Sequence, residues 1–169
     1  MFDRTLILQA KEVLDACRSG GLKLVTAESC TGGLLAAVLT SIPRASDVVE
    51  RGFVTYSDQA KTDMLAVPAA LIAQYGAVSE QVARAMAEGA LGRSPADLAV
   101  SVTGIAGPTG GSAEKPVGLV HFACARRENP TLHVRMLYGD VGRDEIRLLS
   151  VRQAFALILH QASRGSAMA

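Results

Sequence analysis

The sequence predicts an α/β fold, arranged as a three-layer α/β/α sandwich around a mixed, largely parallel sheet. Short apolar runs alternate with amphipathic segments through the first hundred residues, which favours strands joined by helices. Two of these runs lead straight into glycine-rich turns, as parallel strands do where their carboxyl ends share one edge of a sheet. Two adjacent strand patterns and a long final helix follow, so we expect the rest of the sheet to be a hairpin.

The beginning of the chain is expected to form a helix, a strand and a second helix. The first helix is amphipathic and ends at Gly20-Gly21. Residues 22–26 are a short apolar run, typical of a buried strand. The second helix covers residues 34–42 and is stopped by Pro43. The apolar positions that define the two helices are Leu6, Ile7, Ala10, Val13, Leu14, Cys17, Leu34, Leu35, Val38, Leu39 and Ile42.

The middle of the chain is expected to hold one strand and three helices. Residues 48–56 are rich in β-branched and aromatic types, with Gly52 predicting a bend or bulge. Helices should follow over about 58–65, 68–75 and 80–91, each with its own start or stop signal. These signals are Ser57-Asp58, Pro68, Gly76 and Ser79-Glu80, and the inward positions of the third helix are Val82, Ala83, Met86, Ala87, Ala90 and Leu91.

The remaining elements surround an unusual loop. Residues 98–103 read as a second buried strand, and residues 104–116 hold four glycines and two prolines in thirteen positions, a composition that excludes regular structure. We expect strands over 117–125 and 131–138 with their turn at 128–130, and a final helix over about 143–161. The inward residues of this helix are Ile146, Leu149, Val151, Phe155, Leu157, Ile158 and Leu159, and residues 164–169 should be a frayed tail.

Length, composition, net charge and cysteine count limit the kinds of protein that this chain could be. The 169 residues match the usual size of one domain, and 49% hydrophobic but only 4% aromatic residues predict a core of small aliphatic side chains. A formal charge of +1 gives no electrostatic footprint for nucleic acid or an anionic membrane surface. Three scattered cysteines do not form a disulfide framework, and no signal peptide or membrane span is evident. We therefore expect one cytoplasmic domain over residues 1–169.

The turn after the first strand is the leading candidate for a reactive site. Glu28-Ser29-Cys30 ends an apolar run, and Gly32-Gly33 leads into a helix. The unpaired amides at a helix start attract negative charge, so Ser29 could act as a nucleophile beside amides that stabilise an oxyanion. The alternative is that Ser29 or Thr31 is only a helix cap and the glycines only permit close packing.

A serine nucleophile needs a base, and Tyr56 with Lys61 is one pair that could supply it. A lysine kept neutral by its surroundings can take the serine proton, alone or through a tyrosine. Lys61 should lie in the first turns of its helix, where the helix dipole lowers the pKa of an amine. The alternative is a packed tyrosine ring and a solvated lysine.

Other chemistries find less support in the sequence. Neither glycine-rich loop is followed by Lys-Ser or Lys-Thr, and neither matches G-x-G-x-x-G, so a Walker phosphate loop and a Rossmann dinucleotide site are not expected. His121, His133 and His160 show no spacing typical of metal ligands, so we expect no zinc. Only His121, on the strand that leaves the glycine loop, could join a serine in a triad.

Four ordered motifs together resemble the CinA C-terminal domain family over about residues 5–160. They are Thr26-Ala-Glu-Ser-Cys-Thr-Gly-Gly33, Val54-Thr-Tyr-Ser-Asp-Gln-Ala-Lys61, Gly76-Ala-Val-Ser-Glu80, and Thr103-Gly-Ile-Ala-Gly-Pro-Thr-Gly-Gly111 with Lys115-Pro-Val-Gly118. The resemblance implies a nicotinamide-nucleotide amidohydrolase that converts nicotinamide mononucleotide to nicotinate mononucleotide and ammonia. It also implies a metal-independent Ser-Lys-Tyr mechanism with no cofactor, and a homodimer.

The resemblance places the catalytic residues at Ser29, Lys61 and Tyr56. We expect the amides of residues 30–33 to form the oxyanion hole, and residues 103–111 to wrap the ribose phosphate through backbone N–H groups and Thr109. The full set of expected substrate contacts is Cys30, Thr31, Gly32, Gly33, Thr103, Gly104, Ala106, Gly107, Thr109, Gly110 and Arg143. Arg143 matches the family's Gly-Asp-Arg motif with two extra residues, Val141-Gly142, inserted before it.

Two other classes of function stay open at this point. One is a binding or regulatory module that holds a nucleotide in the same pocket without turning it over. The other is a hydrolase of a nucleotide pyrophosphate, which should need a divalent cation and a carboxylate cluster. Glu28 and Asp58 are the only acids near the expected site, which weakens this second alternative.

Overall fold

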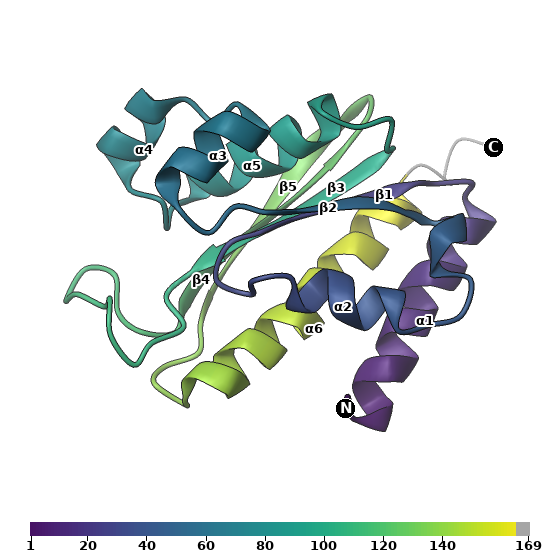
Figure 1. Cartoon of the computed structure of the whole chain (residues 1–169), viewed down its shortest axis with the longest axis horizontal. Coiled ribbons are helices and arrows are strands. Elements are labelled where there is room, and N and C mark those ends of the chain that lie inside the picture. The colour runs from purple at the N-terminus through teal and green to yellow at the C-terminus, as the bar shows by residue number, and fades with distance from the viewer. Residues whose placement is uncertain (165–169) are drawn as a thin grey trace.

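The computed structural model describes residues 1–164 and confirms the α/β class (Figure 1). The helices are α1 (Arg4–Ser19), α2 (Leu34–Thr40), α3 (Asp58–Leu65), α4 (Ala69–Tyr75), α5 (Glu80–Gly92) and α6 (Arg143–Ser163), with a short 3-10 helix η1 (Ala45–Asp47). The strands are β1 (Leu24–Glu28), β2 (Val49–Val54), β3 (Leu98–Gly104), β4 (Leu119–Arg126) and β5 (Asn129–Leu137).

Helices cover both faces of the sheet, as the sandwich predicts. Figure 1 shows α3, α4 and α5 above the sheet and α1, α2 and α6 below it. Each face has its own apolar core, and both cores are built mainly from aliphatic side chains with few aromatic rings. Small aliphatic side chains, rather than large aromatic rings, therefore fill the space between the closely packed layers.

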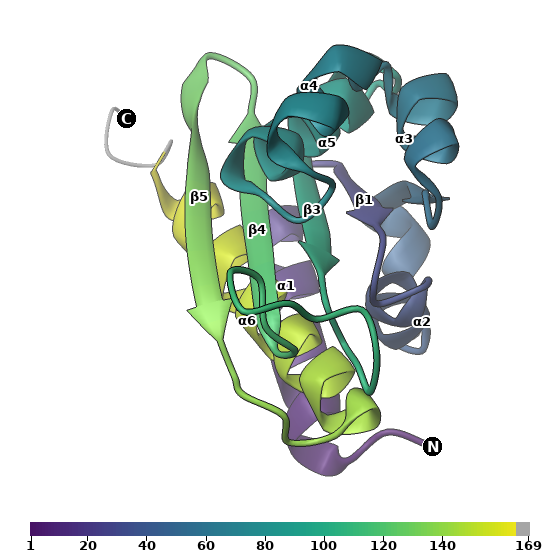
Figure 2. The ribbon, with the colours of Figure 1, turned by 90° about the vertical axis from the view of Figure 1, so that its left-hand side faces the viewer.

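The sheet is mixed, with strand order β2-β1-β3-β4-β5. Strand β1 pairs in parallel with both β2 and β3, whereas β4 pairs antiparallel with β3 and with β5 (Figure 2). The carboxyl ends of β1, β2 and β3 consequently lie at one edge of the sheet. Every residue of β1 is buried, so the segment that leaves this strand starts from a rigid support.

Several strand boundaries differ from the sequence expectation by one or two residues; β2, for example, covers Val49–Val54 rather than 48–56. Strand β1 covers Leu24–Glu28 rather than 22–26, which brings Glu28 into the strand. The hairpin turn lies at Arg127-Glu128 rather than 128–130, because Arg126 pairs with Asn129 and Glu128 adopts a left-handed backbone with φ 63°. Pro130 is then inside β5, an edge strand, where a missing N–H need not break the ladder.

The irregularity expected near Gly52 is present in β2. The pairing register shifts between Leu24 and Val25, which pair with Val49 and Arg51, so Glu50 is the extra residue. Gly52 itself is needed for a close approach, since a Cβ there would lie 2.8 Å from the Thr26 hydroxyl oxygen.

The structure also bears on the expected tail and on membrane-spanning helices. Residues 165–169 of the expected tail lie outside the described residues, and Arg164 is the last one placed. Between residues 1 and 164, no helix is both long enough and apolar enough to cross a membrane.

Candidate active site

A cavity of about 270 Å³ opens at the sheet edge where β1, β2 and β3 end. Eleven of the fourteen residues predicted for the site line it: Ser29, Cys30, Tyr56, Lys61, Thr103, Gly104, Ala106, Gly107, Thr109, Gly110 and Arg143. Asp58, Ala77, Val78 and Ile105 complete the lining, whereas Thr31, Gly32 and Gly33 lie outside it. The cavity is near the lower end of the range of about 300–1,000 Å³ typical of ligand pockets.

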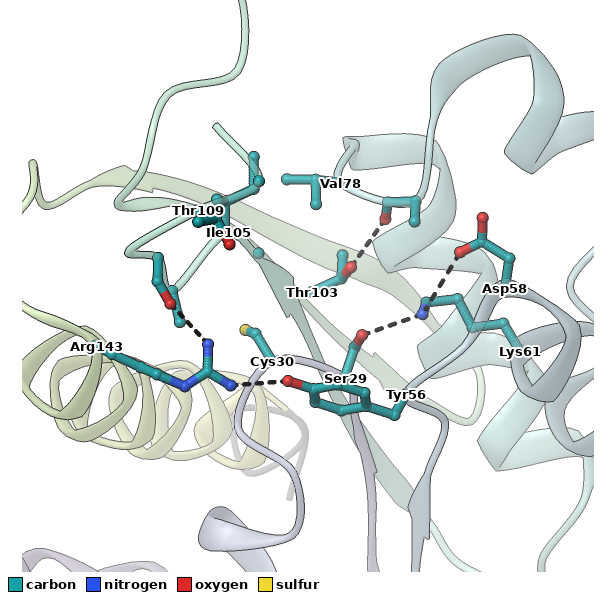
Figure 3. Close-up of a pocket in the computed structure, with 15 residues that line it drawn as sticks. Ser29, Cys30, Tyr56, Asp58, Lys61, Val78, Thr103, Ile105, Thr109 and Arg143 are labelled. Carbon is teal, nitrogen blue, oxygen red and sulfur yellow. Dashed lines mark hydrogen bonds and ion pairs between the residues drawn. The ribbon is translucent and has the colours of Figure 1, made fainter. Parts of the chain in front are cut away.

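Ser29 and Lys61 meet inside this cavity. The Lys61 Nζ atom lies 3.0 Å from the Ser29 Oγ atom, and Figure 3 shows the two side chains pointing toward one another. Ser29 directly follows β1, where its N–H donates to Val102 O at 2.9 Å. Lys61 lies in the first turns of α3, whose cap is the Ser57 hydroxyl, accepting from Ala60 N. A serine and a lysine from separate segments are thus held within hydrogen-bond distance by regular structure.

The surroundings of Lys61 favour a neutral amine. The side chain is 1% exposed, and this burial lowers its pKa from the ordinary value of 10.5. Its Nζ atom also lies 3.0 Å from Thr55 O and 3.5 Å from Ser57 O. A neutral amine can donate its two N–H groups to these carbonyls and accept the Ser29 hydroxyl proton with its lone pair.

Asp58 acts against the effect of burial on Lys61. Its Oδ1 atom lies 4.0 Å from Lys61 Nζ, and the negative charge raises the pKa of the amine. Because the Asp58 side chain is 64% exposed, solvent weakens this attraction, and burial remains the larger influence.

Cys30 competes poorly with Ser29 as a nucleophile. Burial raises the pKa of the Cys30 thiol to about 12, so the reactive thiolate is scarce near neutral pH. The hydroxyl of Ser29, by contrast, already contacts an amine. The geometry therefore favours the serine.

Tyr56 lies in the cavity but does not contact the lysine. Its hydroxyl is 2.8 Å from Arg143 Nη2, and the side chain is exposed at the cavity wall. Figure 3 shows its hydroxyl directed at Arg143, away from Lys61. Of the three expected catalytic residues, Ser29 and Lys61 are joined directly, whereas Tyr56 belongs to a neighbouring pair.

The glycine-rich loop forms the opposite wall and is fixed at several points. Arg143 Nη1 donates to Gly107 O at 2.8 Å, and the Thr103 hydroxyl donates to Ala77 O at 2.8 Å. Lys115 Nζ donates to Tyr75 O, which ties the far side of the loop to α4. Gly107 has φ 73°, and a Cβ there would lie 2.6 Å from Val117 Cγ1, so no larger residue fits this bend.

The amino end of α2 is occupied by a buried side chain. The Glu28 carboxylate accepts hydrogen bonds from the N–H groups of Gly33, Leu35 and Ala36 at 2.9–3.1 Å, and Glu28 is 0% exposed. The Gly32 N–H donates to Ser29 O at 3.0 Å. The sequence-based expectation that Gly32 and Gly33 donate to an oxyanion is therefore dropped, because both amides already have acceptors. The Glu28 carboxylate already accepts hydrogen bonds from Gly33, Leu35 and Ala36 and is not free to bind a cation.

The histidines do not join the site. His121 Nδ1 lies 2.9 Å from His133 Nε2, and His133 Nδ1 lies 3.6 Å from Glu80 Oε2. Burial, with a smaller effect from His133, lowers the pKa of His121 to about 4. His121 thus contacts another histidine rather than Ser29. No group of three His, Cys, Asp or Glu side chains suited to a metal ion gathers within residues 1–164.

One residue near the site was not predicted. Arg147, one helical turn after Arg143 in α6, donates from Nη2 to Thr31 O at 3.0 Å. The spacing of the two arginines was visible in the sequence, because residues four apart share a helix face. What the sequence does not reveal is that this face packs against the Ser29 turn.

Comparison with known proteins identifies relatives at the level of family, sequence and structure. The model of the CinA C-terminal domain matches residues 8–162. The nicotinamide-nucleotide amidohydrolase PncC of Escherichia coli K12 is 48% identical over 160 residues, which cover 94% of this chain and 93% of that protein. A CinA-like protein of Akkermansia muciniphila is 55% identical over 138 residues, which cover 82% of this chain but 33% of that protein.

Solved structures agree with these matches. The crystal structure of competence/damage inducible protein CihA from Agrobacterium tumefaciens superposes with a TM-score of 0.93 at 52% identity, covering 97% of this chain and 99% of that one. The chain spans about a third of the length of several curated relatives, 33% in Akkermansia muciniphila and 34% in Symbiobacterium thermophilum, and nearly all of others.

Proposed function

The chain belongs to the CinA C-terminal domain family, and we propose that it is an amidohydrolase that converts nicotinamide mononucleotide to nicotinate mononucleotide and ammonia. The observation that carries this proposal is the 3.0 Å contact between Ser29 Oγ and Lys61 Nζ inside the cavity. The PncC relative, which matches over nearly its whole length, supports the choice of substrate.

In the first half of the reaction, Ser29 Oγ attacks the carboxamide carbon while neutral Lys61 takes the hydroxyl proton. The carbonyl oxygen becomes an oxyanion. Cys30 lines the cavity, its N–H lies in the turn that the Gly32 N–H closes onto Ser29 O, and it donates to no backbone acceptor within residues 1–164. We assign the oxyanion to this amide.

The tetrahedral intermediate then collapses with cleavage of the carbon–nitrogen bond. Protonated Lys61 returns its proton to the departing nitrogen, and ammonia leaves an ester between Ser29 and the nicotinate carbonyl. Water attacks this ester with Lys61 again acting as base, which releases nicotinate mononucleotide and restores the Ser29 hydroxyl. Lys61 is the immediate base in this scheme because it, and not Tyr56, contacts Ser29.

The other cavity residues would bind the nucleotide. Gly104, Ala106, Gly107, Thr109 and Gly110 line the cavity together with Arg143, and we assign the phosphate contacts to their backbone N–H groups and to the Thr109 hydroxyl. Arg143 has no carboxylate within ion-pair distance in the described chain, so its positive charge favours a phosphate nearby. The Tyr56 ring supplies a wall for the pyridine. The homodimer and the single domain expected from the sequence stay predictions.

A direct assay tests the proposal. Purified protein is incubated with nicotinamide mononucleotide, nicotinamide or the oxidised dinucleotide, and ammonia is measured over time. We expect release from the mononucleotide and much less from nicotinamide, which lacks the ribose phosphate. Binding of the mononucleotide without ammonia would instead support the non-catalytic nucleotide-binding module.

We expect Asp58→Asn to move the acid limb of the pH profile of kcat/KM to lower pH. The Asp58 carboxylate raises the pKa of Lys61, so its removal lowers that pKa and keeps the amine neutral in more acidic solution. Asp63→Asn is the matched control on the same helix, because Asp63 contacts Gln59 rather than the lysine. An acid limb that stays in place in Asp58→Asn would show that titration of Lys61 does not control the rate.

A further inference from the structure

Arg147 holds the turn that carries the candidate nucleophile. Its Nη2 atom donates to Thr31 O at 3.0 Å, and the same oxygen accepts from Leu34 N at 3.0 Å. Thr31 is 0% exposed, and a Cβ at Gly32 would lie 3.8 Å from Arg147 Nη2. The guanidinium therefore packs closely on the turn that begins at Ser29.

The peptide unit between Thr31 and Gly32 is fixed at both ends. Its carbonyl is bound by Arg147, and its N–H donates to Ser29 O at 3.0 Å. A peptide unit bound on both sides cannot rotate without losing hydrogen bonds. The direction of the Cys30 N–H depends on this constraint, because Cys30 belongs to the same short turn.

The Arg147 guanidinium also makes fewer hydrogen bonds than a group that only stabilises the fold would make. Its Nε atom is buried and has no hydrogen-bond acceptor in the described part of the chain, and the same holds for Thr31 Oγ1. Within residues 1–164 no carboxylate lies within 4.0 Å of Arg147, whereas Arg152 on the same helix pairs with Asp3 at 2.8 Å. A buried N–H without an acceptor destabilises a fold, so its presence at this position needs an explanation.

Resting on the proposed amidohydrolase function, we propose that Arg147 is a positioning residue for the reaction. It acts through Thr31 O to hold the Ser29 turn, so that the Cys30 amide faces the substrate oxygen at the moment it becomes negative. Its permanent positive charge beside the turn favours that same negative charge. Arg147 need not touch the substrate to have this effect.

Arg147→Ala should lower kcat by about 100-fold, the size of effect expected when a reacting group is misplaced by about 1 Å. KM should change much less, because the residues that line the nucleotide cavity are untouched. Arg147→Lys retains one donor for Thr31 O and should lie between the alanine variant and wild type. Added guanidinium ion should restore part of the kcat of Arg147→Ala, a recovery that loss of stability alone would not give.

Arg152→Ala is the matched control. It removes another arginine of α6, one that binds Gln9 and Asp3, and so weakens the packing of α6 on α1 without reaching the cavity. We expect its kcat to match wild type. A kcat for Arg147→Ala close to wild type, or a loss that follows only the fraction of unfolded protein, would overturn the proposal.

A second measurement separates this inference from the proposed substrate. A fluorophosphonate reagent should modify Ser29 in wild type, as followed by the mass of the intact protein, and Ser29→Ala identifies the site. Arg147→Ala should be modified much more slowly, whether or not the mononucleotide is the substrate. Equal modification rates, or no modification of wild type, would contradict the proposed role; modification without ammonia release would overturn only the proposed function.

Discussion

Replacing Ser29 with alanine should lower turnover of nicotinamide mononucleotide by about 10⁴-fold or more, because no other nucleophile in the cavity is poised to replace it. Cys30 cannot take over, since its thiol has a pKa of about 12. Binding of the mononucleotide should survive, because the hydroxyl contributes mainly to bond formation. Ammonia release and isothermal titration calorimetry measure the two effects separately.

Ser101→Ala is the matched control for this substitution. Its hydroxyl is buried and donates to Ala83 O at 2.6 Å, outside the cavity. This variant should lose some stability and keep its turnover, whereas Ser29→Ala should keep its stability and lose its turnover. Deamidation by Ser29→Ala at the wild-type rate would rule out the serine mechanism.

Replacing Lys61 with methionine should lower kcat by about 10³-fold, within the range of 10²–10⁴ expected for loss of a general base. Methionine keeps much of the apolar length of lysine and removes only the amine that contacts Ser29. The residual rate should lose the acid limb that Lys61 gives the wild type. Lys11→Met, on the exposed side of α1, should leave kcat unchanged.

The same variant tests whether Lys61 is held neutral. Its folded-state pKa lies below the value of 10.5 expected for the unfolded chain, so between these two values the unfolded state binds more protons. The free energy of unfolding of wild type should therefore rise with pH, relative to Lys61→Met, across that window. Urea denaturation at several pH values measures the difference, and a constant difference would mean that burial does not change the titration of Lys61.

The local signals in the sequence were sufficient to place the serine and the lysine. An apolar run followed by glycines predicts where Ser29 leaves the sheet, and the Ser57 cap fixes the start of α3 and so the position of Lys61. That both lie at one sheet edge follows from the parallel pairing of β1 with β2. Their distance could not be predicted, because it depends on how α3 packs.

The contacts that the sequence could not predict are those made across long separations. Glu28 was read as an acid near the turn, but its hydrogen bonds to α2 follow from a strand that ends two residues later than its apolar run suggested. Arg147 is 116 residues from Thr31, and only the packing of α6 below the sheet brings them together. Nor could spacing show that Tyr56 would contact Arg143 instead of Lys61.

Helix α6 comes last in the described chain, yet it contributes Arg143 to a cavity whose other lining residues lie between positions 29 and 110. A ribosome therefore finishes the serine and lysine segments before it makes Arg147, which holds the serine turn, and Arg143, which binds Tyr56 and Gly107. Because folding can begin during synthesis, the emerging chain can assemble much of its sheet while it is still inactive. Enzymatic competence should appear only when the final helix docks, so the onset of ammonia release in a synchronised translation reaction would report completion of the fold.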